Sequence, residues 1–181
     1  ERLVGSEMCI RDSHKVAENV YLHLLNTSTN YVYIMTPYLI LDDELVRAMT
    51  FAARRGVDVR IIMPGIPDKQ YAFDIATTYF KVLLDAGVRI FRYTPGFVHA
   101  KVYVSDAKQA VVGTINTDYR SLYQNFEDGV YLYKNLEVIK IEQDFEKTQA
   151  LSEEVTLESL SKIPMAHRLG GYLFSLIGPL M

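Results

Sequence analysis

The chain has 181 residues, which is long enough for one domain with a sizeable core. Hydrophobic residues make up 49% and charged residues 23%, a balance typical of globular proteins rather than disordered ones. The net charge of −3 argues against a general nucleic-acid binder, which is more often basic. Because Cys9 is the only cysteine, an intrachain disulfide and a thiolate cluster around a metal are both excluded.

Membrane and targeting segments are not expected from this sequence. No apolar run approaches the ~20 residues of a membrane span, and the opening lacks the apolar stretch of a signal peptide. The first dozen residues, ERLVGSEMCIRD, follow neither a helical nor a strand pattern. We interpret residues 1–12 as a cloning or sequence scar, or a frayed end, expect them to be disordered, and assign residues 13–181 to a single domain.

The first half of the domain alternates helices and strands. Asp42 and Asp43 are N-cap candidates for a helix that ends at Gly56, and a second helix ends at Gly87. The order strand, helix, Gly, strand occurs twice and is typical of a parallel βαβ sheet. The predicted helices are 14–26, 43–55 and 71–86, and the predicted strands are 31–37, 57–63 and 88–93.

The second half changes character. Strands at 98–105 and 110–114 are joined by the short turn DAKQ, which predicts a hairpin. A helical turn near 117–123, a strand at 126–133 and a helix at 136–149 follow. The tail, 151–181, has no clear pattern, and we expect its apolar end, 168–181, to pack against the domain rather than insert into a membrane surface.

A histidine and a lysine stand two positions apart in the predicted strand 98–105. Because side chains alternate along a strand, His99, Lys101 and Tyr103 are expected on one face. Ala100, Val102 and Val104 would then face the core.

The hairpin is expected to bring Asn116 back beside Lys101. An ammonium, an amide and an imidazole together suit a phosphate. Gly113 would let a ligand or a backbone segment come close. Glu127, on the next predicted strand, is the best candidate to accept a hydrogen bond from Nδ1 of His99 and leave Nε2 for chemistry.

These residues carry a resemblance. The spacing His99-x-Lys101-x4-Asp106, followed by GTIN at 113–116, resembles the HxKxxxxD motif of the phospholipase D superfamily. The segments TPYLILDDELVRAM, AARRGVDVRIIMPGIPDK, LLDAGVRIFRYTPGFVHAK and NFEDG look like the C-terminal half of bacterial cardiolipin synthases, so that the resemblance covers about residues 12–181. It implies an α/β fold with a mixed sheet flanked by helices on both faces.

The resemblance also implies a role for each matching position. His99 would be catalytic, as nucleophile or as general acid and base. Lys101, Thr114 and Asn116 would bind the phosphate, although Thr114 also suits a plain strand position. Glu127 would hold the histidine. Asp106 would be a supporting member of the motif away from the phosphate, and it also suits a turn.

The sequence also supports expectations for three further residues near the motif. Asn125 stands where the family often has a histidine, which puts any role for that position in doubt. Asp118 and Arg120 suggest a local ion pair.

The implied reaction is phosphatidyl transfer between two phosphatidylglycerol molecules, giving cardiolipin and glycerol through a phosphohistidine, with no metal or cofactor. Such enzymes carry two motifs and this chain has one, so the expected partner is the N-terminal half of the same enzyme or a second copy. We expect phosphatidylglycerol and a membrane surface as further partners, and no nucleic acid. The full-length protein would lie at the bacterial cytoplasmic membrane, with this fragment soluble or peripheral. Two rival hypotheses are a single-motif homodimeric phosphodiesterase or nuclease and a non-catalytic half-domain.

Overall fold

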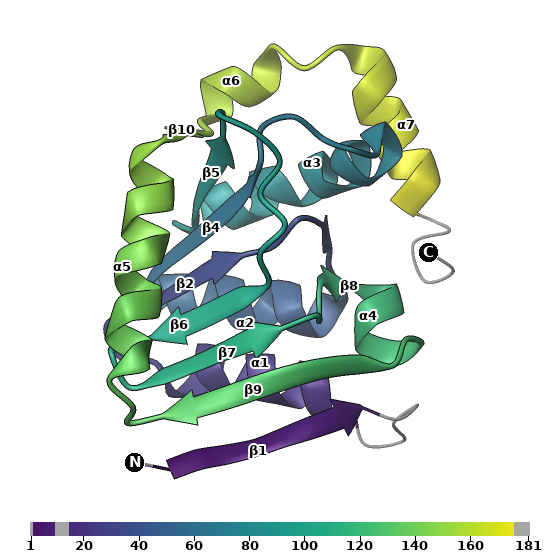
Figure 1. The fold of residues 1–181 in the computed structure, drawn as a ribbon. Coiled ribbons are helices and arrows are strands. Elements are labelled where there is room, and N and C mark those ends of the chain that lie inside the picture. Colours follow the sequence, from purple (N-terminus) through teal and green to yellow (C-terminus); the bar gives the residue numbers. More distant parts are fainter. Residues whose placement is uncertain (1, 10–14, 176–181) are drawn as a thin grey trace.

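An eight-stranded mixed sheet forms the centre of the molecule (Figure 1). The computed structural model describes residues 2–9 and 15–175. The strand order is β1-β9-β7-β6-β2-β4-β5-β10, and β3 pairs with β8 in a small second sheet. The strands are β1 (Arg2–Cys9), β2 (Tyr31–Met35), β3 (Leu39–Ile40), β4 (Asp58–Pro64), β5 (Arg89–Tyr93), β6 (Val102–Ser105), β7 (Gln109–Gly113), β8 (Thr117–Asp118), β9 (Glu127–Tyr133) and β10 (Ser152–Glu154).

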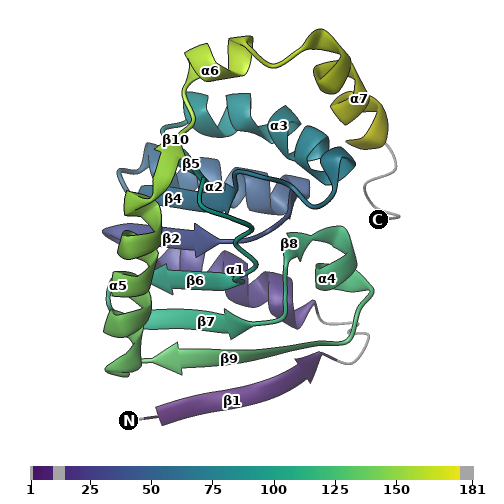
Figure 2. The same cartoon turned by 45° about the horizontal axis from the view of Figure 1, so that its top comes forward.

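Helices cover both faces of this sheet, as predicted (Figures 1 and 2). The helix α5 lies across one face, and α1 and α2 lie behind the other. The helices are α1 (Val16–Thr27), α2 (Asp43–Arg54), α3 (Gln70–Asp85), α4 (Tyr119–Tyr123), α5 (Glu137–Ala150), α6 (Leu157–Ser161) and α7 (Met165–Ser175).

The parallel half of the sheet confirms the βαβ prediction. Strands β2, β4 and β5 are parallel, and α2 and α3 connect them. The Asp42 side chain caps α2 by accepting a hydrogen bond from Leu45 N at 2.7 Å. Gly56 and Gly87 follow α2 and α3 with φ values of +94° and +97°, in the left-handed region that favours glycine.

The antiparallel half begins with the predicted hairpin. Strands β6 and β7 pair from Ser105 with Gln109 to Val102 with Val112. Asp106 and Ala107, between them, both have positive φ, which suits the right-handed twist of a tight hairpin. Strand β9 then pairs antiparallel with β7.

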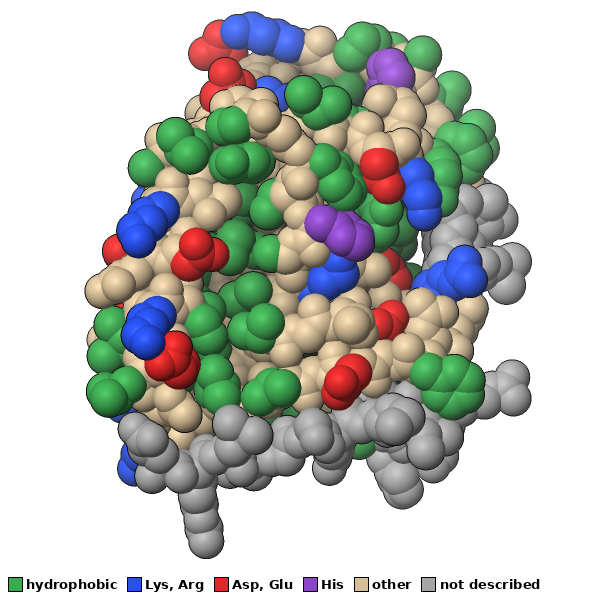
Figure 3. All heavy atoms as spheres, viewed as in Figure 1, with side chains coloured by type: hydrophobic (Ala, Val, Ile, Leu, Met, Phe, Trp, Pro, Cys, Tyr) green, Lys and Arg blue, Asp and Glu red, His purple; other side chains and the backbone are tan. Residues whose placement is uncertain are grey.

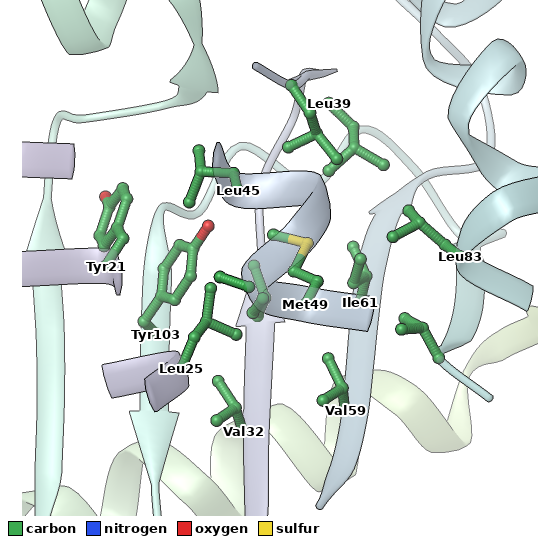
Figure 4. Close-up of a cluster of buried hydrophobic side chains, with 14 of the residues drawn as sticks. Tyr21, Leu25, Val32, Leu39, Leu45, Met49, Val59, Ile61, Leu83 and Tyr103 are labelled. Carbon is green, nitrogen blue, oxygen red and sulfur yellow. The ribbon is translucent and has the colours of Figure 1, made fainter. Parts of the chain in front are cut away.

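Both faces of β6 are buried, which corrects one expectation. Tyr103 is 1% exposed and stacks on Tyr21 of α1, with ring centroids 3.9 Å apart. Figure 4 shows this pair in the core formed with α1, α2 and α3. Val102 and Val104 belong to the second core, under α5 with Phe145. Tyr103 is therefore a core residue and does not share an open face with His99 and Lys101.

Strand β6 is also shorter than the predicted 98–105. It begins at Val102, which pairs with Met35, the last residue of β2. Because β2 stops there, the preceding residues have no strand partner on that side. His99 and Lys101 thus lie in the segment that leads into the strand, and strand alternation does not fix their direction.

The N-terminal end of the chain differs from the sequence expectation. Residues 2–9 form β1, an edge strand antiparallel to β9, although the sequence predicts no regular element there. Edge pairing uses main-chain groups, so side-chain periodicity does not reveal it. Residues 1 and 10–12 lie outside the described residues.

The tail packs against the domain through α7, which lies along α3. Its contacts with α3 include small and polar residues as well as the ring pair of Tyr71 and Phe174, whose centroids lie 6.3 Å apart. Gly171 is buried against the backbone of Asp74, and His167 Nδ1 lies 3.1 Å from the Asp74 carboxylate. Leu169 and Leu173 are each 60% exposed. Residues 176–181 lie outside the described part.

Candidate active site

Five of the six predicted site residues meet at one edge of the sheet. His99 and Lys101 precede β6, Thr114 and Asn116 follow β7, and Glu127 begins β9. Because β7 runs opposite to β6 and β9, these three chain ends coincide. The parallel strands β2, β4 and β5 end at the same edge, where α/β proteins usually bind ligands.

Asp106 lies at the opposite end of β6. Its carboxylate accepts hydrogen bonds from the backbone nitrogens of Thr29, Asn30 and Tyr31 at 2.7, 2.9 and 2.9 Å, and from the Thr29 hydroxyl at 2.9 Å. Partial burial works to raise the pKa of Asp106, but these hydrogen bonds hold it below its usual value. Asp106 thus fastens the hairpin to the start of β2.

The His99 ring is exposed and stacks on Phe97, with centroids 5.5 Å apart. Partial burial lowers its pKa, and the positive charges of Lys101 and Lys69 lower it further, against an opposing effect of Asp68. The imidazole is consequently neutral near pH 7, the form that can attack phosphorus or accept a proton.

Lys101 is held beside the histidine by the main chain. Its ammonium donates a hydrogen bond to the carbonyl oxygen of His99 at 2.7 Å. Burial lowers the pKa of Lys101, while the negative charges of Glu127 and Asp118 act to raise it. The lysine is therefore bound to the main chain of the histidine and feels the charges of two carboxylates.

Glu127 is buried, and its carboxylate accepts hydrogen bonds from the Thr114 hydroxyl and from Asn125 Nδ2, the latter at 3.0 Å. Within residues 15–175, no hydrogen bond joins it to His99. The Thr114 hydroxyl also accepts from Asp128 N at 2.9 Å. These contacts tie the end of β7 to the start of β9, and a direct Glu127–His99 bond stays a prediction.

Asn116 follows β7 in the turn toward α4. Its Nδ2 donates to the Ser121 hydroxyl at 3.1 Å, and its Oδ1 is buried without a hydrogen-bond partner in the described part of the chain. The preceding Gly113 allows a backbone approach: a Cβ there would lie 2.2 Å from Asp128 O and 2.6 Å from Gly129 Cα. Gly113 thus serves the β7–β9 contact.

Figure 3 shows the face of the molecule that is turned toward the viewer in Figure 1. A histidine lies near the middle of this face, next to a basic side chain and with acidic side chains nearby. A neutral imidazole, an ammonium and an amide at one open edge can bind a phosphate and attack it or transfer a proton to it. Among the described residues, no three His, Cys, Asp or Glu side chains gather as metal ligands would.

Comparison with known proteins decides the family. Residues 21–149 match the family described as "Cardiolipin synthase, PLD-like domain". The chain belongs to this family.

Similar full-length proteins extend this assignment over most of the domain. The domain is 54% identical over 170 residues to a Streptococcus mutans protein named "Uncharacterized protein", covering 94% of the chain and 37% of the relative. It is 39% identical to a cardiolipin synthase of Clostridium perfringens, covering 91% and 34%, and 37% identical to cardiolipin synthase 2 of Bacillus anthracis, covering 91% and 32%. The chain thus spans about a third of the length of these relatives.

Solved structures share the fold of this PLD-like domain. Nuc of Salmonella typhimurium, a phospholipase D family member, superposes with a TM-score of 0.70 at 17% identity, covering 83% of the domain and 96% of Nuc. Phosphatidylserine synthase of Haemophilus influenzae gives 0.71 at 16% identity, covering 98% and 47%. At such identities the likeness establishes the fold alone. No described helix of the domain is long and apolar enough to cross a bilayer.

Sequence reasoning missed two residues that act on this edge. Lys69 and Asp68, in the loop after β4, act electrostatically on His99. The signal was available, since a polar loop at the carboxyl end of a parallel strand is a favoured ligand position. The expected Asp118–Arg120 ion pair is wrong: Asp118 caps α4 through Ser121 N at 2.8 Å, and Arg120 donates to Asn125 at 3.2 Å.

Proposed function

We propose that this PLD-like domain is one catalytic half of a phosphatidyltransferase that joins two phosphatidylglycerol molecules into cardiolipin. Relatives named cardiolipin synthase, 36–39% identical over 91% of the chain, support the substrate class. The observation that carries the proposal is the meeting of His99, Lys101 and Asn116 at one edge of the sheet. A phospholipid phosphate carries a single negative charge, which the ammonium offsets.

The first step breaks one phosphodiester bond. A neutral imidazole attacks phosphorus and a nitrogen–phosphorus bond forms. The bond between phosphorus and the oxygen of the headgroup glycerol breaks. A second histidine donates its proton to that oxygen, so that glycerol leaves neutral. Lys101 and the Asn116 amide stabilise the charge on the phosphoryl oxygens in the transition state.

The second step returns the phosphatidyl group to an alcohol. The second histidine removes the proton from a hydroxyl of another phosphatidylglycerol, an oxygen–phosphorus bond forms, and the nitrogen–phosphorus bond breaks. Cardiolipin is released and both histidines return to their starting forms. His99 supplies one of the two imidazoles, and its lowered pKa suits attack and proton removal alike.

The other imidazole comes from outside this chain in the proposal. The sequence contains one HxKxxxxD motif, and the relatives are about three times longer. The second motif would come from the rest of a longer protein or from a second copy of this chain. Both arrangements place the edge that carries His99 at an interface.

An assay against two substrate classes tests the proposed function. The full-length protein that contains this sequence is incubated with phosphatidylglycerol vesicles or with single-stranded DNA. We expect cardiolipin and glycerol in equal amounts and intact DNA. DNA cleavage without cardiolipin would instead support the homodimeric nuclease, and inertness toward both substrates would support a non-catalytic half-domain.

A further inference from the structure

A polar pocket of about 490 Å³ opens beside the candidate active site, between the loop after β4 and the segment from β8 to α4. Asn116 lies on its wall, so the pocket begins where the phosphate site ends. The residues of the pocket that matter here are Tyr38, Lys69, Tyr71, Asn116, Arg120 and Asn125.

Two cationic side chains line this pocket from different segments. Lys69 lies over the Tyr38 ring, with its ammonium 5.2 Å from the centroid. Arg120 uses Nε to donate to Asn125 Oδ1 at 3.2 Å. Across the residues that the structure describes, neither cation forms an ion pair with a carboxylate. Both charges are therefore available to an anion.

One carboxylate, Asp118, also lines the pocket, but it is buried and forms a hydrogen bond within the protein. It is 6% exposed, and its Oδ1 accepts the hydrogen bond from Ser121 N that begins α4. Burial raises its pKa, and the nearby charge of Glu127 acts in the same direction. The exposed charges of the pocket are thus the two cations.

Asn116 connects the two sites. Its amide is held by Ser121 on the pocket side, and its Oδ1 is the buried atom that lacks a partner. The same amide acts as a donor that lowers the pKa of Asp118, so Nδ2 faces the pocket residues Asp118 and Ser121. A ligand that spans the edge and the pocket would therefore pass beside Nδ2.

We propose that this pocket binds the phosphodiester of the acceptor lipid, with Lys69 and Arg120 as its anion-binding residues. This rests on the proposed function, in which the acceptor is itself anionic. The donor phosphate occupies the His99 edge, and the acceptor carries its own phosphate a three-carbon glycerol away from the attacking hydroxyl. A second cationic subsite beside that edge positions the hydroxyl and selects anionic acceptors over neutral alcohols.

The test compares a charged and an uncharged acceptor in one enzyme. The full-length protein receives phosphatidylglycerol as donor and ethanol as a competing acceptor, and cardiolipin and phosphatidylethanol are measured together. We expect Lys69→Met combined with Arg120→Met to lower the ratio of cardiolipin to phosphatidylethanol at least tenfold. Both products arise from the same first step, so a change in that step alters their amounts equally and leaves the ratio of cardiolipin to phosphatidylethanol unchanged. This includes any effect of Lys69 on the pKa of His99.

A matched pair of substitutions serves as control. Lys108→Met with Arg54→Met removes the same charge from exposed positions outside the pocket and should leave the ratio unchanged.

Two soluble competitors distinguish a lipid headgroup from a free anion as the ligand of the pocket. If the pocket binds the headgroup, deacylated phosphatidylglycerol should reduce cardiolipin formation more than phosphatidylethanol formation. Inorganic phosphate should not have this selective effect.

Three outcomes would overturn the proposal. An unchanged ratio in the pocket variant, with both products still formed, would remove the subsite and leave the proposed function standing. Equal suppression by inorganic phosphate would show an unselective anion site. Failure of the unmodified enzyme to transfer to either alcohol would overturn the proposed function and the acceptor subsite with it.

Discussion

The pKa of His99 is lowered by partial burial and shifted by charged neighbours rather than by hydrogen bonds. Among the described residues no side chain hydrogen-bonds to its ring; partial burial lowers its pKa most, Lys101 and Lys69 lower it further, and Asp68 acts to raise it. The charged neighbours that shift the pKa of His99 therefore come from two segments, one before β6 and one after β4.

Opposite substitutions should move the pKa of His99 in opposite directions. Lys101→Met removes a positive charge and should raise it, so that the imidazole stays protonated to higher pH. Asp68→Asn should lower it. The histidine Cε1–H signal followed by NMR across pH reports both shifts without any need for activity, and movement in the same direction in both variants would refute the electrostatic origin.

Asp106 is the motif residue whose role is structural. Asp106→Asn should lower the free energy of unfolding by about 2 kcal/mol at pH 7, because hydrogen bonds to the charged carboxylate are lost. The pKa of Asp106 is lower in the folded state, so this stabilisation is present above the unfolded pKa of about 3.9 and disappears as the pH falls through the folded pKa. Urea unfolding at pH 7 and pH 3 checks this.

The exposed Asp144→Asn in α5 provides the comparison for this substitution. It should change stability little at either pH. A loss in Asp106→Asn that is equally large at pH 3 would contradict the assignment to carboxylate charge.

At the scale of elements, α7 is attached to α3 by a close backbone approach. A Cβ at Gly171 would lie 2.3 Å from the carbonyl oxygen of Asp74, whereas a Cβ at Gly170 would find its nearest atoms at 4.0 Å. Gly171→Ala should therefore lower the free energy of unfolding by about 1–3 kcal/mol through overpacking. Gly170→Ala should leave it equal or raise it by up to about 1 kcal/mol through helix propensity.

Thermal unfolding of the two variants, with limited proteolysis at α7, distinguishes these effects. Gly171→Ala should expose α7 to cleavage and Gly170→Ala should not. Equal behaviour of the two variants would show that α7 is not held on α3 in this way.

Elements marked by local chemistry were predictable from the sequence. Asp42, Gly56 and Gly87 mark helix ends through a cap and through positive φ, and the turn at Asp106 marks the hairpin. Elements that depend on distant partners were not. Strand β1 exists through its pairing with β9, and the residues before Val102 leave the strand because β2 ends at Met35.

The candidate site shows the same division. The motif placed His99, Lys101, Asn116 and Glu127 near one another, because they flank adjacent strands. The effects of Lys69 and Asp68 on the pKa of His99 come from a loop some thirty residues earlier in the chain. This loop lies at the same edge because β4 and β5 are parallel, which local sequence patterns do not reveal. The hydrogen bonds of Glu127 to Thr114 and Asn125 likewise depend on how β7 and β9 meet.

At the scale of the whole molecule, this chain supplies one of the two imidazoles that the proposed mechanism needs. The isolated chain should form cardiolipin at most feebly, because proton transfer from a positioned acid typically contributes ~10²–10⁴ in rate. Any activity should rise more steeply than linearly with protein concentration as two copies pair. Robust turnover by a species that remains monomeric in sedimentation analysis would contradict the two-histidine account.

The most direct test of the central claim is cardiolipin formation by the full-length protein with a single histidine changed. His99→Asn should reduce the rate from phosphatidylglycerol at least a hundredfold, since it removes one imidazole of the transfer. His23→Asn, at an exposed position of α1 away from the site, should keep the rate of the unmodified protein. Retention of the full rate by a folded His99→Asn protein would contradict the assignment of this edge as the active site.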